Sequence, residues 1–134
     1  ESRRIIGEYT LTEDDVLSAR RFPDGVARQW YYVDVHNPDG VGLEGKADHT
    51  RIPPRGTWYE APYRCMVPKG REQLLVAGRC ISATREALGS CRVTVCCAEL
   101  GEAAGVAAVM ALHQGIPVRR VPGEAVRREV LPPL

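Results

Sequence analysis

Apolar residues follow two different patterns along this chain, and the pattern changes near residue 63. Before that point, short apolar stretches alternate with polar ones. Residues 3–10 have the composition of a strand, and residues 30–36 form a second strand candidate with mixed faces. Thr12 is followed by three acidic residues, which is typical of a helix start, so a helix is predicted over about 13–20.

After residue 63 the apolar runs are longer and built from aliphatic and small residues. Residues 63–67 predict a short strand and residues 68–70 a turn. Residues 73–78, with the sequence QLLVAG, form an apolar run that ends in glycine. This pattern is typical of a buried parallel strand in an α/β sheet. A single parallel strand cannot satisfy its own backbone groups, so we expect its neighbours to come from a missing segment or from another chain.

A loop over residues 79–90 leads to a predicted long helix over about 92–114, which Gly115 ends; a short helix is expected over 122–130. One face of the long helix carries small residues at helical spacing, namely Ala98, Gly101, Ala104, Gly105 and Ala108. Glycine inside a helix costs about 1 kcal/mol relative to alanine. The two glycines therefore indicate close approach by another backbone or by a flat ligand.

The aromatic residues are confined to the first part of the chain. All eight precede residue 64, namely Tyr9, Phe22, Trp30, Tyr31, Tyr32, Trp58, Tyr59 and Tyr63. Residues 37–56 are rich in Gly, Pro, Asp and Lys and predict a long loop. Aromatic side chains line ligand cavities, whereas small residues allow close backbone packing. The chain is therefore expected to contain parts of two regions, one that lines a ligand cavity and one in which backbones pack closely.

Charge and cysteine content narrow the classes of function. The net charge is +1, which gives no electrostatic reason to expect nucleic acid or an anionic membrane as partner. No apolar run was expected to span a membrane. Five cysteines without paired spacing predict buried thiols in a reducing compartment, hence a cytoplasmic protein, and no metal site.

The second part of the chain carries a compound motif. Its pieces are YRCMVP at 63–68, LLVAGRCISAT at 74–84, SCRV at 90–93 and GEAAG at 101–105. Together they resemble the C-terminal segment of FAD-dependent oxidoreductases related to the fumarate reductase flavoprotein and glutathione-reductase-type folds. ESRRI at 1–5 and DVHN at 34–37 fit the stretch that precedes this segment in the same family.

The resemblance implies a cofactor role for one group of residues. In such flavoproteins, the strand that ends at Gly78 brings the backbone close to the ribityl-pyrophosphate of FAD, and Arg79 follows it there. The next helix begins near Val93 and Thr94 and points its N-terminus at the flavin. The positive end of a helix favours negative charge, such as that on reduced flavin. The helix glycines Gly101 and Gly105, from the small face above, are either packing residues or further cofactor contacts.

Three other residues are candidates for the substrate side and for catalysis. Arg92 lies near the start of the long helix, and an arginine there can bind a substrate carboxylate bidentately. Arg64, beside Tyr63, is a similar candidate. His36 titrates near neutrality, and Asp34 on the same predicted strand face can orient it.

The resemblance predicts an α/β fold, which is α+β for an isolated fragment. Residues 1–62 would be part of a substrate or cap domain, residues 63–115 the C-terminal strand and long helix of a Rossmann-like FAD domain, and residues 116–134 a tail. The glycine motif that holds the FAD pyrophosphate, G-x-G-x-x-G, is absent from the sequence. We therefore expect a C-terminal fragment that binds FAD weakly or not at all when alone and acts on a small-molecule substrate together with a missing N-terminal half.

Two alternatives stay open from the sequence. One is a non-catalytic fragment that oligomerises, burying its unpaired strand and its glycine face against another copy of the chain. The other is a small-molecule-binding α+β module with a pocket lined by Trp30, Tyr32 and Trp58.

Overall fold

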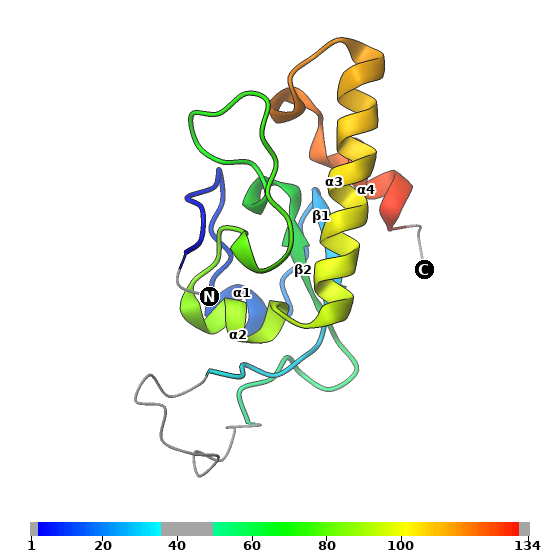
Figure 1. Cartoon of the computed structure of the whole chain (residues 1–134). Helices are drawn as coiled ribbons and strands as arrows, with labels where there is room; N and C mark the ends of the chain where they lie inside the picture. Colours follow the sequence, from blue (N-terminus) through cyan, green and yellow to red (C-terminus); the bar gives the residue numbers. More distant parts are fainter. Residues whose placement is uncertain (1–2, 36–49, 132–134) are drawn as a thin grey trace.

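A computed structural model describes residues 3–35 and 50–131 of the chain. These residues form helices around one two-stranded antiparallel ribbon, so the chain has a mixed helix and strand architecture of the α+β kind (Figure 1). The helix α3 (Thr94–Gln114) runs along one side of the molecule, and the helices α1 (Glu13–Leu17) and α2 (Arg85–Cys91) lie against each other away from it.

The first helix, α1, spans Glu13–Leu17 and is shorter than the predicted 13–20. Its start is as expected. The Thr12 side chain accepts a hydrogen bond from the Asp15 backbone, and the Asp15 carboxylate accepts one from the Thr12 backbone. The helix stops because Ala19 adopts a positive φ of 52°, which an α-helix does not allow.

The ribbon pairs β1 (Gly25–Gln29) with β2 (Tyr59–Pro62). The strand predictions over 3–10, 30–36 and 63–67 are wrong for the described residues. Among the described residues, the first of these segments makes one isolated bridge, between Gly7 and Pro68, and separate backbone hydrogen bonds such as that from the Glu8 N–H to the Val67 carbonyl at 2.9 Å, but no continuous ladder. Residues 30–35 follow β1 without a ladder, although the Val33 N–H donates to the Arg51 carbonyl at 2.8 Å. Tyr63–Cys65 forms a 3-10 helix directly after Pro62.

Helix α2, Arg85–Cys91, lies where a loop over residues 79–90 was predicted. The sequence holds a signal for its start, which is the threonine at the capping position. The Thr84 side chain accepts a hydrogen bond from the Ala87 backbone. The long helix prediction is confirmed as α3, Thr94–Gln114, which ends at the left-handed Gly115. α3 begins two residues later than predicted because Arg92 still closes the end of α2.

Residues 74–77 have no regular secondary structure and residue 73 lies in a bend, so the prediction of a sheet strand over 73–78 is wrong for the described structure. Within the described residues only Val76 of this segment has a regular backbone bond to a neighbour, from its N–H to the Met66 carbonyl at 2.9 Å. Leu74 is 48% exposed. The segment therefore has the composition of a central strand but no sheet beside it.

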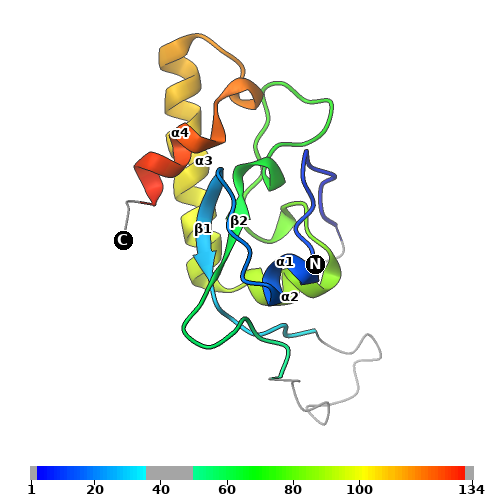
Figure 2. The same ribbon diagram turned by 180° about the vertical axis from the view of Figure 1, so that it is seen from behind.

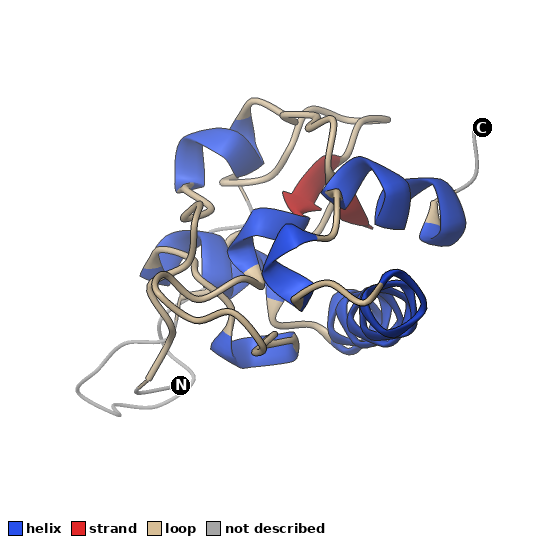
Figure 3. Ribbon diagram, turned by 90° about the horizontal axis from the view of Figure 1, so that it is seen from above, coloured by secondary structure: helices blue, strands red, loops and turns tan. Residues whose placement is uncertain are grey.

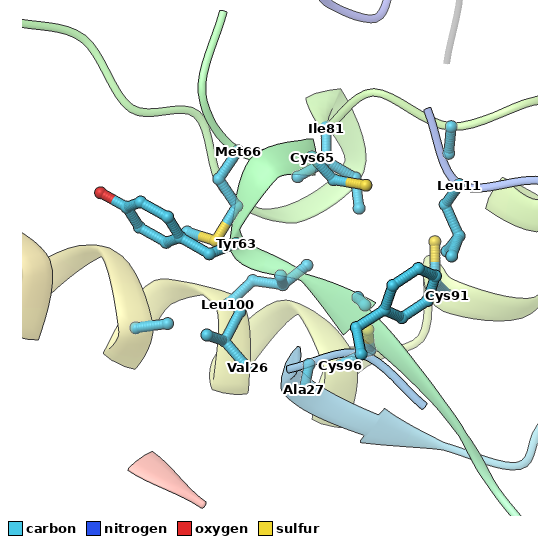
Figure 4. Close-up of a cluster of buried hydrophobic side chains, with 14 of the residues drawn as sticks. Leu11, Val26, Ala27, Tyr63, Cys65, Met66, Ile81, Cys91, Cys96 and Leu100 are labelled. Atoms are coloured by element: carbon cyan, nitrogen blue, oxygen red, sulfur yellow. The ribbon is translucent and has the colours of Figure 1, made fainter. Parts of the chain in front are cut away.

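The core lies between α3, the ribbon and the segments that precede α2. Figure 4 shows its side chains converging from these elements, with Cys96 and Leu100 coming from α3 and Val26 and Ala27 from β1. The last helix, α4 (Gly123–Val130), packs against both α3 and β1 (Figure 2). The expected short helix at 122–130 is thus confirmed, starting one residue later.

One face of α3 is left open. Seen along its axis, the helix lies at the margin of the molecule (Figure 3). Val95, Val109 and Leu112 are 58%, 52% and 80% exposed. Contrary to the expectation above, α3 is long and apolar enough to cross a membrane, but the core helix of a soluble protein passes the same test, so this observation is weak support for a span. The Glu99 carboxylate also accepts a hydrogen bond from the Arg28 backbone of β1, which ties the helix to the ribbon.

Candidate functional site

Four of the predicted cofactor residues lie together at the start of α3. Gly78 adopts a left-handed φ of 71°, so it opens the 3-10 turn Gly78–Cys80 in a conformation that side-chain-bearing residues rarely take. The exposed Arg79 donates from Nε to the Arg92 carbonyl at 3.3 Å, just before Val93. The turn packs against α3. The backbone of Gly78 and the first residues of α3 therefore form one small surface.

The N-terminus of α3 has no side-chain cap. Val93 is the capping residue, with extended φ and ψ angles of −71° and 154°, and its apolar side chain accepts no hydrogen bond. Thr94, the first helical residue, is exposed. The first N–H groups of an α-helix have no acceptor within the helix, and together they make a positive pole. This surface can therefore accept a negatively charged ligand group.

Cys97 lies one turn into α3, beside Gly78. A Cβ atom placed on Gly78 would lie 3.9 Å from the Cys97 sulfur, an ordinary contact, so Gly78 is required here by its backbone angle and not by crowding. Burial raises the pKa of the Cys97 thiol, and the Arg79 charge opposes that shift. Cys97 is thus a neutral, half-buried thiol in the wall of this surface.

The candidate catalytic residue Arg92 lies on the other side of the α2–α3 junction. It is largely buried, and its Nη2 donates to the backbone carbonyl of Asp34 at 2.9 Å and to the Asp34 carboxylate at 3.3 Å. Asp34 was expected to orient His36, which lies outside the described residues. Asp34 contacts Arg92, so these two charges form part of one cavity wall.

Arg64 belongs to a different cavity. It binds the Asp24 carboxylate bidentately, at 2.8 Å from Nε and 3.0 Å from Nη2, and it lies over the Tyr9 ring. The cavities that contain Arg64 and Arg92 have no lining residue in common. The structure therefore does not bring these two candidate arginines together within the described residues.

Gly101 and Gly105 face outward on α3. A Cβ atom on either would meet nothing within 4 Å among the described residues. At 1.5 Å rise per residue, Gly101 lies about 10 Å along the helix from Thr94, and Gly105 farther still. Both glycines are therefore open to whatever covers this face, and neither packs against the described part of the chain.

The aromatic pocket considered as an alternative is not assembled. The Arg21 guanidinium stacks on the Trp58 ring at 3.5 Å, and Trp30 is 63% exposed. Tyr32 stacks on Tyr31. None of the three predicted lining residues borders any of the three cavities described for this chain.

Sequence reasoning missed three residues that border the cavity around Arg92, namely Arg4, Arg85 and Gly89. Arg4 and Arg85 resemble scattered surface charges in the sequence. Gly89 had a detectable signal, because a glycine in a helix carries a cost that close packing explains. In the described residues no group of three or more His, Cys, Asp or Glu is placed to hold a metal ion.

The comparisons with known proteins agree with the motif. A family model described as FAD dependent oxidoreductase matches residues 1–130. Neither the curated proteins nor the solved structures contain a significant match to this chain. The family match covers nearly the whole chain. The chain therefore belongs to the FAD dependent oxidoreductase family, whose cofactor is FAD.

Proposed function

We propose that this chain is the C-terminal part of a flavin-dependent oxidoreductase, in which it completes the FAD site and contributes one wall of the substrate pocket. The observation that carries the proposal is the meeting of Gly78, Arg79 and the uncapped start of α3 on one surface. A left-handed glycine, an exposed arginine and a free helix N-terminus suit a ligand that carries phosphates and a polar, electron-accepting ring.

The residues at this surface carry chemical groups that suit the binding of FAD. Gly78 presents backbone without a side chain, so a large ligand can approach it closely. The exposed Arg79 can bind a phosphate oxygen with its planar guanidinium. The N–H groups at Thr94 and the next residues offer hydrogen bonds and a positive pole. Bound FAD would supply the two-electron redox chemistry, while these residues bind and orient the cofactor.

The open surfaces support a missing partner segment. Residues 73–77 have the composition of a sheet strand but no neighbouring strand, and the outer face of α3 exposes Val95, Val109 and Leu112. Burial of such apolar groups contributes about 25 cal/mol per Å², so exposure of all of them is unfavourable. We propose that the N-terminal half of the flavoprotein covers both surfaces, placing residues 63–115 in a Rossmann-like FAD domain. A second copy of the chain is the competing occupant.

The proposed boundaries are those predicted above, with residues 1–62 in a substrate or cap domain and residues 116–134 as a tail. A small molecule is the expected substrate, and the described candidates Arg92 and Arg64 each border a cavity. The five free cysteines suit a reducing, cytoplasmic location.

The experiment uses the longer flavoprotein that carries this sequence. Arg79→Gln removes the exposed charge beside Gly78, and Arg71→Gln, a change at another exposed arginine, is the matched control. We expect about tenfold weaker FAD binding for the first variant, since a hydrogen bond to a charged group contributes about 1.5 kcal/mol or more. Equal FAD affinity in both variants would contradict the proposed role of Arg79.

A further inference from the structure

A cavity of about 510 Å³ lies between the N-terminal segment and the residues that follow the 3-10 turn Gly78–Cys80. Its lining includes two arginines, two isoleucines and two residues with hydroxyl groups: Arg3, Arg4, Ile5, Ile6, Thr10 and Ser82. The volume is that of a typical small-molecule pocket. The lining has no residue in common with the surface of Gly78, Arg79 and Thr94, so this cavity is separate from the proposed FAD site.

Backbone contacts hold the two walls of this cavity together. The Ile5 N–H donates to the Cys80 carbonyl at 3.0 Å. Farther along the same segment, the Leu11 N–H donates to the Ser82 carbonyl, also at 3.0 Å. Between these two bonds, a Cβ atom on Gly7 would lie 2.8 Å from the Ser82 Cβ, so the missing side chain lets the two segments lie this close. The groups that line the cavity are therefore carried on segments that are fixed against each other.

The two arginines leave their positive charge uncompensated. Within residues 3–35 and 50–131, neither the Arg3 nor the Arg4 side chain forms a hydrogen bond or an ion pair, and both are exposed. No acidic residue of the described chain borders the cavity. Arg4 also borders the cavity around Arg92, but the carboxylate there, that of Asp34, is contacted by Arg92 at 3.3 Å. Two positive charges in a concave site favour an anion that carries two negative charges.

A pair of hydroxyl groups adds a hydrogen bond donor. The Thr10 and Ser82 hydroxyl oxygens lie 2.9 Å apart, and Ser82 is 1% exposed. Each hydroxyl has one hydrogen, so one of the two O–H groups donates to the other. The second O–H group has no acceptor among the described residues. An oxygen of a ligand in the cavity can accept this hydrogen bond.

A phosphate monoester matches these groups. It carries a charge of about −1.5 to −2 at pH 7 and presents three acceptor oxygens. The planar guanidinium group of arginine binds phosphate oxygens with two N–H groups at once. A carboxylate carries a single charge, so it would leave one of the two arginines uncompensated. Ile5 and Ile6 add aliphatic surface beside the charges, which suits a ligand with a carbon skeleton.

We propose that this cavity binds a small organic phosphate monoester. Arg3 and Arg4 bind the phosphate group, and the hydroxyl pair of Thr10 and Ser82 donates a hydrogen bond to it. The isoleucines contact the carbon chain of the ligand. The site goes beyond the proposed function, because it lies outside the FAD surface and needs no flavin.

The test is a titration of the 134-residue chain with n-butyl phosphate at constant ionic strength, followed by NMR at the methyl groups of Ile5 and Ile6. n-Butanol has the carbon chain without the charge, butyrate has a carboxylate in place of the phosphate, and inorganic phosphate has no chain. We expect saturable shifts with n-butyl phosphate at concentrations where n-butanol and butyrate cause none, and weaker binding of inorganic phosphate. An equal response to n-butanol or butyrate, or equal or tighter binding of inorganic phosphate, overturns the proposal.

Variants locate the site. Arg3→Gln and Arg4→Gln should each weaken the binding of n-butyl phosphate about tenfold, because each removes a hydrogen bond donor to a charged group. Arg128→Gln, a change at an exposed arginine on α4, is the matched control and should leave the binding unchanged. Unchanged affinity in the Arg3 and Arg4 variants, with native-like spectra, places the ligand elsewhere and contradicts the assignment.

FAD is the competing ligand for the same two arginines, because it also carries phosphate groups. In the longer flavoprotein that we propose, Arg3→Gln and Arg4→Gln should leave the FAD dissociation constant unchanged, whereas Arg79→Gln should raise it. Weaker FAD binding in the Arg3 and Arg4 variants would assign these arginines to the cofactor. That result would overturn the phosphate monoester site and leave the proposed function standing.

Discussion

Arg127 of α4 binds the Glu60 carboxylate of β2 with both ends of its guanidinium group, at 2.7 Å from Nη1 to Oε2 and 2.9 Å from Nη2 to Oε1. The Glu60 side chain is 1% exposed, and it also accepts a hydrogen bond from the Phe22 backbone at 3.0 Å. This buried pair joins the last helix to the ribbon, so the C-terminal helix is part of the folded body.

Removing one partner of a buried ion pair leaves an uncompensated charge. Arg127→Ala should therefore destabilise the chain by about 3 kcal/mol, the low end of the usual range because Arg28 also lies near Glu60, with Nε 3.8 Å from its carboxylate. The adjacent exposed Arg128→Ala should change the free energy of unfolding by less than about 0.5 kcal/mol. Urea unfolding of both variants measures this, and similar small losses would contradict the role of Glu60.

Gly101 and Gly105 should respond to alanine in opposite ways in two contexts. In this chain nothing described crowds either position, so each substitution should raise the free energy of unfolding by about 0.5–1 kcal/mol through helix propensity. In the longer flavoprotein that we propose, a segment packed on α3 would make the same changes destabilising. Gly89→Ala, which meets the Asp34 backbone, should destabilise the chain in either context. Thermal melts of both proteins check the contrast.

The cysteines should differ in reactivity. Cys80 is exposed, whereas Cys65, Cys91 and Cys96 are buried. Burial raises the pKa of Cys65, and the hydrogen bond that the Cys96 thiol makes with Cys91, together with burial, raises that of Cys96, so both stay as unreactive thiols. We expect one fast phase in the reaction of the thiols with a thiol-specific disulfide reagent. This phase should be absent in the Cys80→Ser variant. A fast phase that survives in the double variant Cys80→Ser, Cys97→Ser would contradict the burial of the other three thiols.

Asp15 should make stability depend on acid pH. Burial alone would raise the pKa of Asp15, but the hydrogen bonds from Thr12, Tyr9 and Arg20 outweigh it, and the pKa in the folded chain is lowered. The ionised carboxylate therefore stabilises the fold above its ordinary pKa of 3.8, and this contribution is lost as the pH falls through the lower folded value. Urea unfolding from pH 6 to pH 2 should show this loss, and Asp15→Asn should reduce the dependence.

Some of the fold could be predicted from the sequence, because local signals specify it. The structure has the predicted cap at Thr12, the long apolar helix α3 and the left-handed Gly115 that ends it. Each of these features depends on residues close together in the sequence. Helix α2 was missed although its cap at Thr84 is of the same kind, because its short segment was interpreted as a loop.

The strand predictions failed for a different reason. Strands need partners, and composition does not say where a partner lies. Residues 73–78 have strand composition but no neighbouring strand within the described chain. The strand β1 lies at Gly25–Gln29, whereas a strand was predicted over the following residues, 30–36.

The site could be predicted only in part, for the same reason. The motif predicted that Gly78, Arg79 and Thr94 belong together, and they lie on one surface. The contacts of Arg92 with Asp34 and of Arg64 with Asp24 depend on tertiary packing that the sequence does not specify.

The most direct test of the central claim compares two glycines with the same backbone conformation. Gly78 and Gly70 both have φ of 71°, and neither position is crowded. Alanine at either should cost about 1–2 kcal/mol of stability from the left-handed angle. We propose to measure the FAD dissociation constant of Gly78→Ala and Gly70→Ala in the longer flavoprotein, by flavin fluorescence. We expect FAD binding at least about tenfold weaker for the Gly78 variant alone. Equal FAD affinity in the two variants would contradict it.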